Sequence, residues 1–184
     1  MSVLAMRWGR LFTLAGLGLA AACAPSPTKT ESDTAAPPVA AEEQPSVERG
    51  RYLVTIAGCN DCHTAGFAPS NGKVAESDWL RGDRLGYRGP WGTTYPTNLR
   101  THLAALSEDQ WVGAAKISAA RPPMPVWALQ AMSDTDLRSI YRLVKSLPGP
   151  VGEPAPAALP PGEAPNGPVL QWPEPPPGAA PAAP

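Results

Sequence analysis

The sequence predicts a small all-α domain that lies between two proline-rich flanks. Of the 25 prolines in the 184 residues, 5 fall in residues 24–45 and 14 in residues 148–184, whereas the 102 residues from 46 to 147 hold only 6. Three segments within residues 46–147 place apolar side chains at helical spacing, and no strand of convincing length is present. We therefore expect three main helices in residues 46–147, with disordered or extended segments on both sides.

The first helix is expected at residues 46–57, and it leads directly into Cys59. The apolar stripe that we expect to face the core consists of Tyr52, Leu53 and Ile56. Gly50 lies close to this stripe. Because glycine has no side chain, we expect another helix to approach the first one closely at this point.

The last helix, residues 134–147, has the strongest local signals. Ser133 and Asp136 have the spacing of a capping box at its start, and Pro148 follows its end. The side chains that we expect to face inward are Leu137, Ile140, Tyr141, Val144 and Leu147. This segment is therefore the best-specified element of the domain.

A shorter helix is expected between these two, from about residue 107 to residue 118. Ser107 and Gln110 have the capping-box spacing at its start. The side chains that we expect to face inward are Trp111, Ala114 and Ala115.

Residues 1–22 have the composition of a secretory signal. A cationic start with Arg7 and Arg10 is followed by an unbroken small and apolar run at residues 11–22. Twelve residues are too few to span a bilayer, which needs about 20. We therefore expect export, so that the mature chain acts outside the cytoplasm, in the periplasm.

The signal ends in Leu-Ala-Ala-Ala-Cys at residues 19–23, which resembles the lipobox of bacterial lipoproteins. In that pattern the cysteine, here Cys23, becomes the lipidated first residue, although the leucine here sits one place further from it than usual. The alternative is cleavage by ordinary signal peptidase after the small residues 20–22 or after Ala24. With lipidation, residues 23–45 form a flexible tether to a membrane.

The C-terminal residues 148–184 are expected to form an extended arm, because prolines and glycines recur too often for a helix or a central strand. One apolar island, residues 169–172, could dock on the domain. The alternative is that the whole arm is free.

The motif that carries chemistry is Cys59-Asn60-Asp61-Cys62-His63, the C-x-x-C-H pattern of c-type haem attachment. The two thiols can add to the two vinyl groups of one haem, and the adjacent histidine can supply the proximal nitrogen to the iron. Three alternatives are a thioredoxin-like dithiol, which needs a βαβ setting, a zinc site that also uses His102, and a plain disulfide. A haem would also fill the core of a short domain in a chain that has only two phenylalanines.

Three side chains compete for the sixth position on the iron. Met124 lies in Arg-Pro-Pro-Met-Pro at residues 121–125, where three prolines make a stiff strap that presents one thioether. Met132 directly precedes a helix cap, where packing in the core is the expected role. His102 is expected to be a surface or core histidine. We therefore expect iron ligation by His63 and Met124, with His102 or an open position as the alternatives.

Residues 81–100 are rich in glycine, arginine and aromatic side chains, as expected for a loop that wraps a flat anionic ligand. The candidates to contact the haem edge or the propionates, including one from the strap, are Trp91, Tyr95, Arg84, Arg88 and Arg121. We expect only one or two of these arginines to reach a propionate. Trp91 and Trp127 are expected to be walls of the core.

Residues 46–147 resemble the class I c-type cytochromes, which have a helix before C-x-x-C-H, a methionine strap and a C-terminal helix that crosses the first. Within that class, residues 92–99, 123–125 and 133–137 look like the cytochrome c subunits of bacterial periplasmic dehydrogenases, which share a Tyr-x-x-Asn stretch and a Met-Pro strap. This sequence has one haem motif, whereas those subunits have two or three. The resemblance implies a mono-haem cytochrome c fold, with three main helices around one covalently attached haem.

The expected function is one-electron transfer in the periplasm between redox partner proteins, without catalysis, because an iron with both axial positions filled has no vacancy for a substrate. The alternatives are a haem enzyme or a gas or peroxide sensor with a labile or vacant sixth position, and the electron-transfer subunit of a dehydrogenase. Residues 46–147 carry 12 basic and 9 acidic side chains, which could steer the domain to an acidic partner or be an ordinary mixed surface. The near-zero charge of the whole chain, 15 basic against 16 acidic residues, argues against a nucleic-acid partner.

Overall fold

The computed structural model describes residues 44–173, 176 and 178. The predicted signal segment, Cys23 and nearly all of the predicted tether lie outside the described residues. In chain order the elements are α1 (Val47–Ile56), α2 (Cys59–His63), the 3-10 helix η1 (Glu76–Asp78), β1 (Gly86–Gly89), β2 (Gly92–Thr94), α3 (Leu99–Ala104), α4 (Glu108–Lys116), α5 (Val126–Ala131), α6 (Asp134–Ser146) and β3 (Val169–Gln171). Within the described part, no helix is long and apolar enough to cross a membrane.

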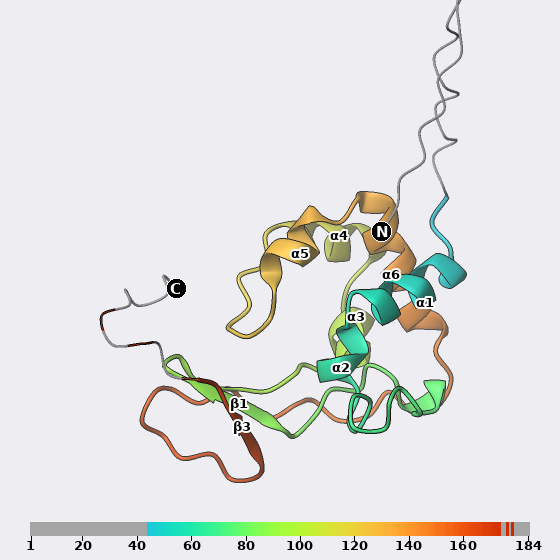
Figure 1. The fold of residues 1–184 in the computed structure, drawn as a ribbon. Helices are drawn as coiled ribbons and strands as arrows, with labels where there is room; N and C mark the ends of the chain where they lie inside the picture. Colours follow the sequence, from blue (N-terminus) through green and yellow to red (C-terminus); the bar gives the residue numbers. More distant parts are fainter. Residues whose placement is uncertain (1–43, 174–175, 177, 179–184) are drawn as a thin grey trace, which may run out of the picture. The chain divides into compact units, whose positions relative to one another are not determined.

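Helices α1 and α6 form the main helix pair of the domain, and they lie against each other in Figure 1. A Cβ atom at Gly50 would lie 2.1 Å from the Ser139 carbonyl oxygen, so only glycine fits at this contact. The expected close approach at Gly50 is therefore confirmed. Two further contacts join the pair, because the Ser46 amide donates to Ser139 Oγ at 3.2 Å and Arg49 Nε donates to Asp136 Oδ1 at 2.9 Å.

The predicted inward stripe of α1 is wrong for two of its three residues. Tyr52 and Ile56 are 53% and 60% exposed, whereas Leu53 and the unpredicted Val54 are buried. The face of α1 that meets α6 is set by the close approach at Gly50, and that approach turns Val54 inward and leaves Tyr52 and Ile56 outside.

The core lies around α6, against which α1, α3 and α4 pack. Ser107 and Gln110 form the expected capping box of α4, and Ser133 Oγ caps α6 by accepting from the Asp136 amide at 3.1 Å. The Asp136 carboxylate pairs with Arg49. Helix α4 ends at Lys116, two residues before the predicted end, and Ala114 is exposed while the unpredicted Val112 is buried. The fully or nearly buried side chains of α6 are Leu137, Ile140, Leu143 and Val144.

A small sheet of three short strands accompanies the helices, so the all-α prediction describes the core and not the whole domain. The strand order is β2-β1-β3, with β1 antiparallel to β2 and parallel to β3. Strand β3 belongs to the C-terminal arm, and its residues are within the island that could dock. The arm also pairs with the outer edge of β2, since Leu159 exchanges two backbone hydrogen bonds with Thr93 at 2.8 and 3.0 Å.

The start of the arm is fixed by a buried arginine. Arg100 is 4% exposed, and its guanidinium donates to the carbonyl oxygens of Pro148 and Pro150 in the arm. It also donates to the carbonyl oxygens of Glu76 and Trp79, each at 2.7 Å. Within residues 44–173 Arg100 forms no ion pair, so backbone oxygens satisfy its charge. These hydrogen bonds attach the arm to the domain at residues 148–150.

Candidate functional site

The two cysteines and the histidine of the C-x-x-C-H motif lie on one short helix, α2. Gly58 precedes this helix with a left-handed backbone (φ 68°), which separates α2 from α1. Cys62 is three residues and His63 four residues after Cys59, so the three side chains share one side of the helix. The local fold therefore presents two thiols and an imidazole together.

Buried hydrogen bonds hold α2 in place. The Thr64 hydroxyl donates to Asn60 Oδ1 at 2.7 Å and accepts from the Leu80 amide at 2.7 Å. The Gly82 amide donates to the His63 carbonyl oxygen at 2.7 Å. Asn60, Thr64 and Leu80 are all at most 1% exposed, so this network ties the motif to residues 80–82.

Cys59 and Cys62 are free thiols, and both are half-buried. Burial raises the pKa of the Cys59 thiol to about 11, so this thiol is protonated at neutral pH. Redox-active dithiols instead have a lowered thiol pKa and need a βαβ setting, which the described residues do not form. The thioredoxin-like alternative therefore finds no support here.

A zinc site finds no support either. Among residues 44–173, no three histidine, cysteine or acidic side chains are placed to hold one metal ion. His102, the distant ligand that such a site would need, is exposed on α3.

The His63 imidazole is oriented by a backbone carbonyl. Its Nδ1 lies 2.7 Å from the Thr97 carbonyl oxygen, and a carbonyl can only accept, so Nδ1 carries the proton. Burial lowers the pKa of His63, and the hydrogen bond to Thr97 partly offsets this effect. The neutral ring therefore keeps the Nε2 lone pair available to a metal, which is the arrangement that a histidine ligand needs.

One face of the sheet borders the motif. The Tyr87 hydroxyl donates to Cys62 Sγ at 3.3 Å, and Tyr87 is paired in register with Thr94 on β2. Paired residues project from the same face, so Thr94 shares the face of Tyr87. A Cβ atom at Gly89, two residues after Tyr87, would meet the Trp91 ring at 2.6 Å, which places that ring on the same face. We call this surface, made of Tyr87, Gly89, Trp91 and Thr94, the thiol face of the sheet.

Tyr87 was not among the predicted site residues. Its side chain reaches Cys62 only because β1 folds back toward α2, and no local pattern in the sequence indicates this contact. Burial and the contact with Cys62 raise the pKa of Tyr87, so its hydroxyl keeps its proton at neutral pH.

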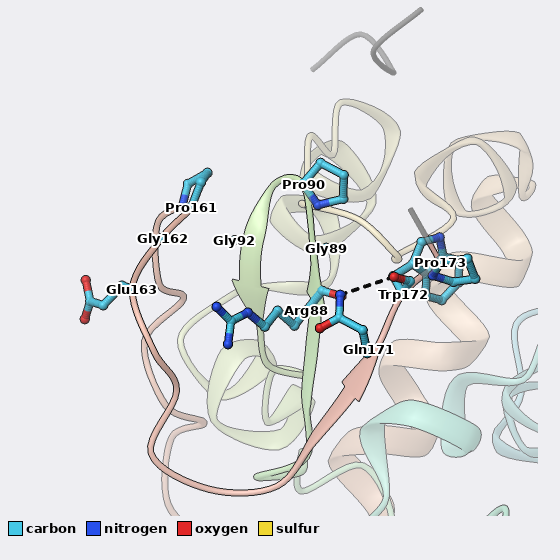
Figure 2. A pocket seen from close by; sticks show the side chains of 10 residues that line it. All are labelled: Arg88, Gly89, Pro90, Gly92, Pro161, Gly162, Glu163, Gln171, Trp172 and Pro173. Carbon is cyan, nitrogen blue, oxygen red and sulfur yellow. Dashed lines mark hydrogen bonds between the residues drawn. The ribbon is translucent and has the colours of Figure 1, made fainter. Parts of the chain in front are cut away.

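The predicted aromatic candidates lie on opposite faces of the sheet. Trp91 is on the thiol face, whereas Tyr95, 9% exposed, packs near Gly86 on the other face. Arg88 also projects from that other face, toward the loop that holds Pro161 and Glu163, as Figure 2 shows. Arg88 lines a cavity of about 560 Å³ at the end of the sheet, together with Gly89 and Trp172.

The strap residues occupy the segment between α4 and α5. Met124 is half-buried, and its amide donates to the Arg121 carbonyl oxygen at 3.3 Å. Met132 packs against the hydrophobic core, as expected. Trp127 is 70% exposed, so its predicted role as a wall of the protein core is wrong, because α5 buries none of its residues. The Met124 carbonyl oxygen accepts from the Val126 amide at 2.9 Å, so backbone hydrogen bonds on both sides fix the strap around Met124.

The predicted arginines have free guanidinium groups. Arg84 and Arg121 are exposed and Arg88 is half-buried, and within the described part of the chain none of the three forms an ion pair. Each therefore has its full donor set available to an anionic group.

The residues present fit a covalently bound haem. The thiols are free, and His63 keeps one nitrogen for iron. Within the described part of the chain, five buried side-chain polar atoms lack a hydrogen-bond partner. Two of them, Trp91 Nε1 and Thr94 Oγ1, lie on the thiol face, where a carboxylate of a bound group would accept from them and relieve this cost. These two orphaned donors lie on the face whose Tyr87 contacts Cys62, and they favour a ligand that carries an anionic group on the edge away from its thiol-linked side.

Comparison with known proteins gives one informative match. The chain is 30% identical over 141 residues to the fructose dehydrogenase cytochrome subunit of Gluconobacter japonicus. The match covers 70% of this chain and 27% of that subunit, so the chain spans about a quarter of the curated relative it matches. No family model matches the chain, and no solved structure matches it. The chain is thus similar, at a distance, to part of a cytochrome subunit.

Proposed function

We propose that this protein is a c-type cytochrome that transfers single electrons in the periplasm. The observation that carries the proposal is the arrangement on α2, where two free thiols share one side of a helix with a neutral imidazole whose Nε2 is available to iron. The similarity to a cytochrome subunit supports it independently. One haem is proposed because the sequence has one C-x-x-C-H motif.

Each residue of the site has a defined role in this proposal. Cys59 and Cys62 hold the haem through two thioether bonds, and His63 provides the proximal nitrogen. The Thr97 carbonyl fixes the tautomer and orientation of the His63 ring. Met124 provides the second axial ligand, while Trp91 and Arg121 contact the polar edge of the group.

When bound, the haem supplies an iron that cycles between the ferrous and ferric states. The chain contributes a buried surface that limits water access and a fixed pair of axial ligands, and both tune the reduction potential. With both axial positions occupied, the protein has no site for a substrate on the iron, so we assign it no catalytic residue.

We further propose that the mature chain is held at a membrane through lipidated Cys23, with residues 24–45 as the tether. Cys23→Ser should then release the protein from the membrane fraction of an exporting bacterial host. Continued membrane association of this variant would contradict lipid anchoring.

The covalent haem has a direct test. The full chain, produced in a host that attaches c-type haem, should be coloured, and the pigment should stay with the protein in acidified organic solvent. The double variant Cys59→Ala and Cys62→Ala should be colourless or lose its pigment, whereas Cys23→Ser should retain it. A colourless wild type, or pigment that is extracted from it, would overturn the proposal.

The rival function is a haem enzyme or a sensor of gas or peroxide with a labile sixth ligand. Carbon monoxide distinguishes the two, because it binds ferrous haem only where a position is open. We expect the reduced visible spectrum to remain unchanged under carbon monoxide at neutral pH. Rapid spectral change would favour the rival.

A second candidate is the electron-transfer subunit of a periplasmic dehydrogenase. The similarity to the fructose dehydrogenase cytochrome subunit favours it over an independent carrier. Co-purification of the tagged chain with a dehydrogenase from its own periplasm would support this role. A chain that purifies alone and exchanges electrons with small redox mediators would support the independent carrier.

A further inference from the structure

The C-terminal arm extends the thiol face of the sheet. Strand β3 pairs with β1 in parallel, with Leu170 opposite Tyr87 and Val169 opposite Gly86. Because register partners project from the same face, Leu170 joins Tyr87 on the thiol face. Val169 projects from the other face, where its Cγ1 would lie 3.2 Å from a Cβ atom at Gly86. Neighbouring strands lie about 4.8 Å apart, so Leu170 is one strand away from the side chain that contacts Cys62.

Trp172 continues the same face beyond β3. Its amide donates to the Arg88 carbonyl oxygen at 2.7 Å, and it follows Leu170 by two residues, so the alternation of a strand brings it to the thiol face. Its ring lies 5.9 Å from that of Trp91 in an edge-to-face arrangement, which confirms this orientation. The arm therefore brings Leu170 and Trp172 beside Tyr87 and Trp91.

The described residues cover these two apolar side chains only in part. Leu170 is 48% exposed and Trp172 is 40% exposed, although both lie on the face that carries the buried, unpartnered Trp91 Nε1 and Thr94 Oγ1. A surface with exposed apolar groups around two orphaned hydrogen-bond donors fits a flat ligand that is apolar over most of its area and anionic at one edge.

We propose that the C-terminal arm completes the haem site, with Leu170 and Trp172 forming an apolar wall against the macrocycle on the thiol face of the sheet. This inference rests on the proposed function. The inference gives a function to the C-terminal arm, for which the proline content alone suggests only an extended segment without a role. It also makes Leu170 and Trp172 positioning residues, which act on the haem environment and not on the chemistry of the iron.

The apolar wall formed by Leu170 and Trp172 should affect the reduction potential of the haem. An apolar cover excludes water from the haem, and a drier environment disfavours the more highly charged ferric state. The arm therefore raises the reduction potential, and loss of the wall should lower it.

The adjacent residues Leu170 and Val169 provide a matched test within one strand, because they project from opposite faces. The holoprotein is labelled with 13C at leucine and valine methyl groups, and the Leu170 and Val169 signals are assigned from the variants Leu170→Ala and Val169→Ala. We expect the Leu170 methyl shifts to differ strongly between the ferrous and ferric forms and those of Val169 to differ much less. Equal, small differences for both residues would overturn the inference.

A second measurement compares midpoint potentials of the holoproteins. Leu170→Gln should lower the potential, Val169→Gln should leave it close to the wild-type value, and a chain that ends at Pro168 should show at least the shift of Leu170→Gln. Unchanged potentials in both Leu170→Gln and the truncated chain would also overturn the inference. These outcomes are separate from failure of the proposed function, which would appear earlier as a chain without covalent haem.

Discussion

Gly50→Ala tests the contact between α1 and α6. The added Cβ atom would lie 2.1 Å from the Ser139 carbonyl oxygen and 2.8 Å from Leu143 Cβ, whereas ordinary contacts between carbon atoms are about 3.5 to 4.0 Å. The added Cβ atom would meet backbone atoms of α6 as well as a side chain, and backbone atoms cannot rotate away. The two helices must therefore move apart by more than about 1 Å. Such a shift would loosen the core around Leu53, Val54 and Leu143.

The expected loss of stability follows from two opposing effects. Overpacking of a close contact costs about 1–3 kcal/mol and occasionally more, and loosening of a close-packed core adds to that cost. Alanine in a helix interior offsets about 1 kcal/mol of it relative to glycine. We expect a net destabilisation of roughly 2 kcal/mol, which corresponds to a fall in Tm of about 8–16 °C for a domain of this size.

Gly113→Ala is the matched control, because Gly113 lies within α4 and a Cβ atom there would meet nothing within 4 Å. We expect this variant to gain up to about 1 kcal/mol from helix propensity alone. Guanidinium unfolding of the two holoproteins, followed by far-UV circular dichroism, measures both changes. Equal stability of Gly50→Ala and Gly113→Ala would refute the packing argument.

Two further predictions, each with a control variant, concern the axial ligand and the anchor of the arm. Met124→Ala should abolish the weak near-red absorption band expected of a thioether-ligated ferric haem and should lower the reduction potential. The control Met132→Ala should retain the band. A band that survives in Met124→Ala would exclude Met124 as the ligand. Arg100→Met should destabilise the domain by about 2–3 kcal/mol, because it removes the donor of four part-buried hydrogen bonds to backbone carbonyl groups, whereas the exposed Arg84→Met should change stability by less than about 0.5 kcal/mol. Similar urea midpoints for the two arginine variants would contradict the structural role of Arg100.

Local signals in the sequence were sufficient to predict the helices whose ends are capped by side chains. The capping box of α4 and the Ser133 cap of α6 depend on residues within three positions of each other, so they can be recognised without tertiary information. The motif on α2 was identifiable for the same reason. The face of α1 that turns inward could not be predicted, because Tyr52 and Ile56 are large hydrophobic side chains like those that are buried. Only the contact at Gly50 decides which face packs on α6.

The sheet and the anchor of the arm could not be predicted because their partners are far apart in the sequence. Strand β3 pairs with residues more than 80 positions earlier, and each strand has only three or four residues. Arg100 resembles a surface charge in the sequence, and it is buried because carbonyl groups from two distant segments converge on it. The contact between Tyr87 and Cys62, which defines the thiol face, depends on the same long-range folding.

The arm also protects the hairpin against intermolecular pairing. Leu159 occupies the outer edge of β2 and β3 occupies the outer edge of β1, so neither edge of the hairpin is open to a strand from another molecule. The new outer strand is only three residues long, and Pro168 and Pro173, which lack amide hydrogens, lie close to its two ends. A segment rich in proline thus ends the sheet and keeps it from serving as a template for aggregation.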